Sequence, residues 1–176
     1  MSNYSIVQCS LEEHGEQILA ILNEAIETST ALYDYKPRTI ESMTPWFTNK
    51  SASGFPVIGA VSTDGKLLGF GTFGQFRVQP AYKYTVEHSV YVHKDHRGQG
   101  LGKVLMLEVI NAAKKLNLHA IIGAIDAENV GSMALHEKLG FKHVGTLPEV
   151  GFKFGRWLDV AFYQLTLETP TNPQDG

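Results

Sequence analysis

Residues 85–103 join a strand pattern, a glycine-rich turn and the start of a helix in one continuous stretch. Valine alternates with mostly polar residues over 85–92, which predicts a strand. Apolar residues then recur at helical spacing from Leu101 onward. The turn between these elements contains three glycines and two cationic residues: Arg97, Gly98, Gly100, Gly102 and Lys103. Glycine lets backbone amides approach an anion, and a helix start points its unpaired N–H groups the same way, so the stretch predicts a phosphate-binding loop.

Three known phosphate-binding patterns compete for this loop. A P-loop is excluded, because its first glycine would fall on Arg97 and its Ser or Thr on Val104. A dinucleotide fingerprint has the wrong glycine spacing, although Asp126 follows at a suitable distance. The third pattern, Arg97-x-x-Gly100-x-Gly102, matches without a gap. It resembles the pyrophosphate loop of the GCN5-related N-acetyltransferases.

The resemblance extends over nearly the whole chain, from about residue 4 to about residue 167. Residues 129–141 are similar to the next signature of that superfamily, an asparagine that opens a helix ending in Glu-Lys-x-Gly-Phe. Residues 26–30, 81–92 and 150–159 resemble, more narrowly, the phosphinothricin / methionine sulfoximine acetyltransferases. The resemblance implies an α/β fold with a mixed central sheet between helices. We expect one acetyltransferase domain over residues 1–168 and a flexible tail over 169–176.

The resemblance also implies acetyl-CoA as the cofactor, held by three parts of the chain. The loop contacts are Arg97, Gly98, Gln99, Gly100, Leu101, Gly102 and Lys103. The strand residues Val90, Tyr91 and Val92 are expected to pair with the pantetheine amides. Asn129 and Ser132 are further candidate contacts, although Asn129 is equally consistent with a helix N-cap.

Two residues are candidates for proton transfer. Glu87 lies in the pattern Thr-Val-Glu-x-x-Val-Tyr-Val, which implies a general base acting through water; the alternative is a solvated strand residue. His136 stands where many superfamily members have a tyrosine general acid. A histidine can transfer a proton near neutral pH, but it can also form only a pocket wall, so its role stays open.

The implied acceptor is the α-amino group of a glutamate-like amino acid, such as phosphinothricin, methionine sulfoximine or methionine sulfone. Arg77 is expected to bind its carboxylate, because the guanidinium fork engages both oxygens, unless it is an ordinary surface arginine. Tyr33 and Tyr35 are candidates for the pocket wall, and Glu87 and His88 are further expected substrate contacts. Two alternatives remain: a non-catalytic acyl-CoA-binding module, and an acetyltransferase for a protein N-terminus or a polyamine.

Composition limits the other functions. The chain has 176 residues, enough for one domain, and its net charge of −3 with scattered basic residues indicates no nucleic-acid partner. Its apolar stretches fall short of the roughly 20 residues that span a membrane, and without a signal pattern we expect a cytoplasmic protein. The single cysteine, Cys9, excludes an internal disulfide and is expected to be buried. His93 and His96 lack further ligands, so no metal is expected. The resemblance implies a homodimer.

Periodicity and turn residues place the remaining elements. Strands are expected at 5–9, 56–62, 67–76, 85–92, 119–125, 141–146 and 158–167, and helices at 12–28, 38–49, 100–116 and 129–138. Asp64-Gly65 predicts a hairpin turn, and Gly140 predicts a left-handed helix stop.

Overall fold

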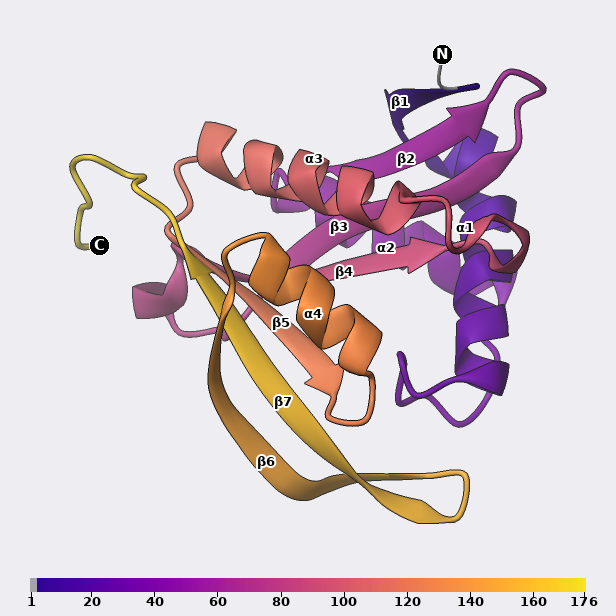
Figure 1. Ribbon diagram of the computed structural model, residues 1–176. Helices are drawn as coiled ribbons and strands as arrows, with labels where there is room; N and C mark the ends of the chain where they lie inside the picture. The colour runs from indigo at the N-terminus through magenta and orange to yellow at the C-terminus, as the bar shows by residue number, and fades with distance from the viewer. Residues whose placement is uncertain (1–2) are drawn as a thin grey trace. The chain divides into compact units, whose positions relative to one another are not determined.

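The computed structural model describes residues 3–176 and contains an α/β arrangement of seven strands and four helices within that part of the chain (Figure 1). The strands are β1 (Tyr4–Gln8), β2 (Val57–Ser62), β3 (Leu67–Gln75), β4 (Thr85–Val92), β5 (Ala120–Asp126), β6 (Lys142–Lys153) and β7 (Arg156–Thr166). The helices are α1 (Leu11–Thr28), α2 (Met43–Ala52), α3 (Leu101–Lys115) and α4 (Val130–Lys138). Three short 3-10 turns, η1 (Ile40–Ser42), η2 (Pro80–Tyr82) and η3 (Lys94–His96), complete the elements.

The strands are hydrogen-bonded in the order β1-β2-β3-β4-β5-β7-β6. The pair β4–β5 is parallel, whereas β1–β2, β2–β3, β5–β7 and β6–β7 are antiparallel. The predicted mixed sheet is therefore confirmed. The chain divides into two compact units, and β4 and α3 each contribute residues to both of them.

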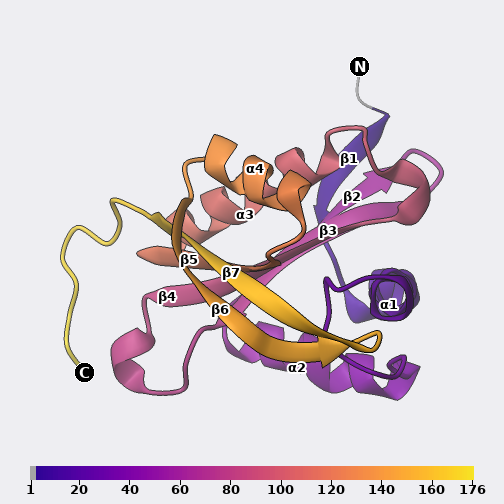
Figure 2. The ribbon, with the colours of Figure 1, turned by 60° about the horizontal axis from the view of Figure 1, so that its bottom comes forward.

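The first unit comprises the residues up to Phe73 together with residues 89–109. Its strands are covered on both faces, by α1 and α2 on one side and by the first part of α3 on the other (Figure 2). Ile18, Leu22 and Met43 of the helices α1 and α2 pack with Phe70 on one face. On the other face, buried apolar side chains come from β2, β3 and α3: Ala60, Leu68, Leu101 and Leu105.

Two glycines of β3 let α3 lie close to the sheet. A Cβ atom on Gly69 would lie 2.8 Å from the backbone oxygen of Tyr91 and 3.1 Å from Leu105 Cδ1. A Cβ atom on Gly71 would lie 2.8 Å from Val109 Cγ2. Such distances are well inside van der Waals contact, so any side chain at these positions would push the helix away from the strand.

The second unit comprises residues 74–88 and 110–176. In it the first half of β4 pairs with β5, and β5 pairs with β7, which forms a long hairpin with β6. Helix α4 packs against β5 and β6, and its last turn ends at Gly140, which has the predicted positive φ of 93°. After residue 167 the chain contacts this unit through Thr169, whose carbonyl lies 2.8 Å from His119 Nδ1.

Most predicted element boundaries agree with the structure to within one or two residues. The exceptions are α2, which was expected at 38–49 and begins only at Met43, and the β6–β7 hairpin, which is longer than expected. Residues 147–157 were not predicted as strands, because Pro148 and two glycines interrupt the alternation. In the structure the pairing shifts register between Leu147 and Gly151 and continues to a tight turn. Phe154 and Gly155 form that turn with φ values of 53° and 73°, the backbone of a type I′ hairpin.

Candidate active site

The predicted phosphate loop takes a conformation that requires its glycines. Gly98 and Gly100 have φ values of 76° and 81°, and a Cβ atom on either would meet no other atom within 4 Å. These glycines are therefore needed for the backbone conformation and not for space. Helix α3 begins at Leu101, and its first internal hydrogen bond runs from Val104 N–H to the Gly100 carbonyl at 3.2 Å. The N–H groups before Val104 have no partner within the helix and are available to an anion.

Arg97 is held in place by two contacts inside the first unit. Its Nε donates a hydrogen bond to the Val92 carbonyl at 3.2 Å, and its guanidinium forms an ion pair with Glu24 of α1. The side chain stays half exposed. The contacts orient the guanidinium beside the loop, and its role in binding phosphate stays a prediction.

We expect Gly100→Val to weaken acetyl-CoA binding, since a β-branched residue at this positive φ forces the loop backbone to change. The apparent KM for acetyl-CoA should rise at least about tenfold, on the scale of the roughly 1–2 kcal/mol cost of left-handed backbone. Gly65→Val is the matched control: Gly65 has a φ of 83°, is equally open, and lies in the β2–β3 turn. If both variants leave KM unchanged in folded protein, the loop does not bind the cofactor.

The side chains at the end of β4 pack against the first unit on both faces of the sheet. Val90 and Val92 pack against the α3 face of the first unit. Tyr91 points to the other face, where its ring centroid lies 5.4 Å from that of Phe70. Pairing of this strand segment with the pantetheine amides remains a prediction.

Asn129 is the N-cap of α4. Its side-chain oxygen accepts a hydrogen bond from the Ser132 N–H at 3.0 Å. The capping role that the sequence left open is thus present. Asn129 is exposed and Ser132 is half-buried, and contact of either with the cofactor stays a prediction.

The charge of Arg77 acts on the carboxyl of Glu87 within the second unit. Glu87 is half-buried on β4, and burial raises the pKa of its carboxyl above the usual range. The positive charge of Arg77 opposes that rise and lowers the same pKa. Arg77 is exposed just beyond β3, donates to the Phe76 carbonyl at 3.1 Å and lies over the Phe76 ring at 4.5 Å. A half-buried carboxyl with a raised pKa that also feels the charge of a guanidinium is suited to act as a base.

His88 and His136 form a direct pair that the sequence did not predict. Their Nε2 atoms lie 2.8 Å apart, and His136 Nδ1 lies 2.7 Å from the Ser132 carbonyl oxygen. The two rings stack with centroids 5.0 Å apart, and Phe141 packs edge-on against both. Successive side chains of a strand point to opposite faces, so His88 turns away from the face of Glu87 and toward α4. The two histidines are 48 residues apart in the sequence, so no local sequence pattern predicts their contact.

Tyr33 and Tyr35 belong to the first unit, in the segment between α1 and η1. Their side chains are 39% and 74% exposed, which is compatible with a pocket wall. Their contact with an amino-acid substrate stays a prediction.

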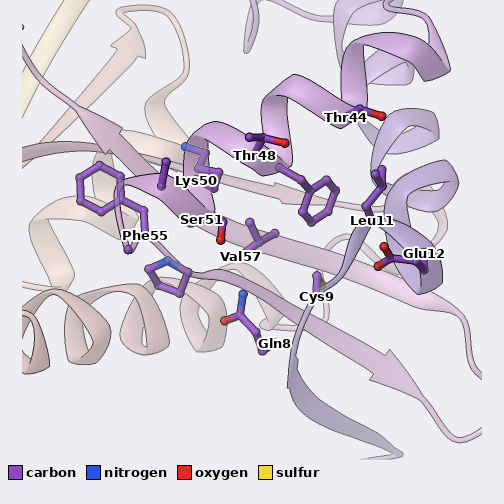
Figure 3. Close-up of a pocket in the computed structure, with 14 residues that line it drawn as sticks. Gln8, Cys9, Leu11, Glu12, Thr44, Thr48, Lys50, Ser51, Phe55 and Val57 are labelled. Atoms are coloured by element: carbon purple, nitrogen blue, oxygen red, sulfur yellow. The ribbon is translucent and has the colours of Figure 1, made fainter.

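A separate cavity of about 800 Å³ lies in the first unit beside α2 and the start of β2 (Figure 3). None of the predicted site residues lines it. Lys50, at its edge, donates to the Phe73 carbonyl at 2.8 Å, and burial lowers its pKa to about 8. Cys9 is buried as predicted, and burial raises the pKa of its thiol to about 12, which leaves it unreactive.

Within residues 3–176, no cluster of three or more histidine, cysteine or carboxylate side chains could hold a metal ion. No helix in the same range is long and apolar enough to cross a bilayer.

The chain was compared with known proteins. The sequence profile of the Acetyltransferase (GNAT) family matches residues 18–141. The chain belongs to this acetyltransferase family. It is 41% identical to the L-methionine sulfoximine/L-methionine sulfone acetyltransferase of Pseudomonas aeruginosa over 86% of this chain and 88% of that protein.

Two solved structures share the fold over nearly their whole length. The N-acetyltransferase of Staphylococcus aureus Mu50 has 45% identity and a TM-score of 0.90, covering 94% of this chain and 99% of that one. The GNAT phosphinothricin acetyltransferase of Sinorhizobium meliloti, solved with acetyl-CoA, has 30% identity and a TM-score of 0.92, covering 99% and 94%. The predicted fold, enzyme class and cofactor are confirmed. The glycine loop and helix start of this acetyltransferase remain the predicted site for the phosphates of acetyl-CoA.

Proposed function

We propose that this GNAT enzyme acetylates the α-amino group of glutamate-like amino acids such as methionine sulfoximine, methionine sulfone and phosphinothricin. The observation in the structure that carries the proposal is that the charge of Arg77 acts on the half-buried carboxyl of Glu87 in the second unit. An α-amino acid presents a carboxylate and an ammonium two bonds apart. Its recognition and deprotonation need a cation and a base, the roles that we propose for Arg77 and Glu87. The names of the related enzymes support the same substrate class.

Each residue then has a defined task. Bound acetyl-CoA supplies an acetyl group activated as a thioester. The loop at 97–103 holds the phosphates through backbone N–H groups, Arg77 binds the α-carboxylate, and Glu87 accepts a proton from the ammonium through water. Burial disfavours the ionised carboxylate of Glu87, so its affinity for a proton is raised toward that of the amine it must deprotonate. The second proton-transfer role belongs to the pair formed by His88 and His136.

Free-thiol release from acetyl-CoA tests the proposal directly. The purified enzyme is offered methionine sulfoximine, methionine sulfone, phosphinothricin, glutamate, spermidine and an N-terminal peptide, each at the same concentration. The first three should give the highest kcat/KM, with the product identified by mass as the N-acetyl amino acid. A preference for spermidine or the peptide would contradict the substrate assignment. Tight acetyl-CoA binding without turnover of any amine would instead indicate the non-catalytic alternative.

We also propose that the enzyme is a cytoplasmic homodimer that associates through the β6–β7 hairpin. Large apolar side chains are exposed along this one hairpin, and each is at least 45% exposed: Val144, Leu147, Val150, Phe152, Phe154 and Trp157. Such a concentration of exposed apolar surface is typical of protein interfaces. Strand β6 is also an edge strand of the sheet. Sedimentation equilibrium would give the mass of two chains if the proposal is right. A single-chain mass at micromolar concentration would contradict it.

A further inference from the structure

One nitrogen of the histidine pair lacks a partner. Among the residues that the structure describes, His88 Nδ1 is buried and accepts or donates no hydrogen bond. Buried polar atoms are nearly always paired, because an unpaired one loses its hydration without compensation. An exception of this kind at a candidate active site indicates a ligand partner.

The hydrogen bonds around the pair determine where each proton lies. The Ser132 carbonyl can only accept, so His136 Nδ1 carries a hydrogen and donates it at 2.7 Å. A neutral His136 therefore has a bare Nε2, which must accept from His88 Nε2–H at 2.8 Å. A neutral His88 with its hydrogen on Nε2 has a bare Nδ1. The unpartnered atom is thus an acceptor that requires an N–H, O–H or S–H donor.

The surroundings keep both rings neutral at rest. Burial lowers the pKa of His88, and the neighbouring His136 lowers it further. Burial also lowers the pKa of His136, and the Ser132 carbonyl partly opposes that change. Gly123 of β5 leaves the space for the contact: a Cβ atom there would lie 2.9 Å from Nε2 of each ring. The neighbouring strand β5 therefore leaves room for the two rings at Gly123.

We propose that Nδ1 of His88 is the second proton-transfer atom of the acetylation, with His136 as the positioning residue that fixes its tautomer. The inference rests on the proposed function. Both nitrogens of His136 are engaged inside the protein, so the one nitrogen of the pair without a protein partner is Nδ1 of His88. His136 then acts through His88.

The protons balance in this scheme. An ammonium must lose two protons to become an amide N–H, and the departing thiolate must gain one. Glu87, whose side chain lies on the other face of β4, accepts the first proton through water and passes it to solvent. His88 Nδ1 accepts the second as the nitrogen bonds to the acetyl carbon. It donates that proton to sulfur as the C–S bond breaks with its electron pair on sulfur. The pair returns to its neutral state, ready for the next turnover.

Two substitutions of His88 test the roles of its two ring nitrogens separately. His88→Gln keeps an N–H that can donate to His136 Nε2 and removes the Nδ1 acceptor. It should lower kcat about a hundredfold, with KM for both substrates within twofold of wild type. His88→Asn keeps a hydrogen-bond acceptor near the Nδ1 position but is too short to reach His136, and because its amide cannot accept a proton it should also lower kcat about a hundredfold. His143→Gln, at an exposed histidine of β6, is the control and should change neither parameter. Circular dichroism melting confirms that each variant folds.

Two further variants test the positioning role. His136→Asn keeps a donor for the Ser132 carbonyl and removes the acceptor for His88. Gly123→Ala leaves both imidazoles intact and forces them apart. Both should lower kcat about tenfold while KM stays within twofold. Wild-type kcat in folded Gly123→Ala and His136→Asn would overturn the positioning role.

A binding measurement tests the open acceptor without any turnover. The thiol of CoA has an S–H donor, whereas the thioester of acetyl-CoA has none at sulfur. His88→Gln should therefore lower the affinity for CoA about fivefold by calorimetry and leave acetyl-CoA affinity unchanged. An unchanged ratio of the two affinities, or a His88→Gln kcat within threefold of wild type, would overturn the proposal. Because this ratio is independent of the acceptor, it stays informative if the amino-acid assignment fails.

Discussion

Glu87→Gln should lower kcat for methionine sulfoximine by at least about a hundredfold, the usual effect of removing a general base. The amide has nearly the same size but cannot accept a proton at neutral pH, so the fold and acetyl-CoA affinity should be unchanged. Activity should recover partly at high pH, where solvent supplies more of the free amine. Steady-state kinetics between pH 6 and 10 measure both effects.

The pH dependence of the wild type gives a second test of Glu87. The base works only when ionised, so kcat/KM should rise with pH through the raised pKa of this carboxyl. Glu16→Gln, at an exposed position of α1, is the control for loss of one negative charge and should behave as wild type. Wild-type kcat in Glu87→Gln would show that Glu87 is only a half-buried strand residue.

Arg77→Ala should lower kcat/KM for methionine sulfoximine about 10- to 100-fold, as expected for hydrogen bonds to a charged group worth roughly 1.5–3 kcal/mol. Arg77→Lys keeps the charge but loses the two-pronged geometry, so it should fall between wild type and alanine. Acetyl-CoA affinity should stay within twofold in both variants. The same removal of charge should raise the pKa of Glu87 further and shift the acid limb of the pH profile to higher pH.

The amine that methionine sulfoximine would give on decarboxylation separates carboxylate recognition from a general electrostatic effect. Wild type should acetylate this amine poorly, and Arg77→Ala should acetylate it no worse than wild type does. Equal use of both compounds by wild type, or an alanine variant that loses nothing, would show that the carboxylate is bound elsewhere.

The sequence predicted the parts of this enzyme that depend on local patterns. The strand at 85–92, the glycine loop and the helix from Leu101 are each specified by residues that are neighbours in the chain. The positive φ values at Gly98 and Gly140 follow from the same local logic. The family then supplied candidate roles for the residues in these patterns.

Sequence reasoning failed where tertiary packing decides. The pairing of His88 with His136 depends on β4 and α4 meeting across Gly123, and no single-sequence signal marks that glycine as the space for two imidazoles. The length of the β6–β7 hairpin was missed for a related reason. Strand pairing across a register shift overrides Pro148, and Phe154 occupies a turn position that usually favours asparagine or glycine.

The close packing of α3 on β3 fixes the position of the predicted phosphate loop, which leads into this helix. Because Gly69 and Gly71 have no side chains, Leu105 and Val109 pack close to the strand backbone, and these contacts fix the position of the helix. The helix start at Leu101 lies eight residues, or about 12 Å of helical rise, from the contact at Val109. A small displacement of the helix at these contacts would therefore move the helix start and the loop amides with it. The direction of the loop amides is therefore set in part by the absence of side chains at two positions of β3.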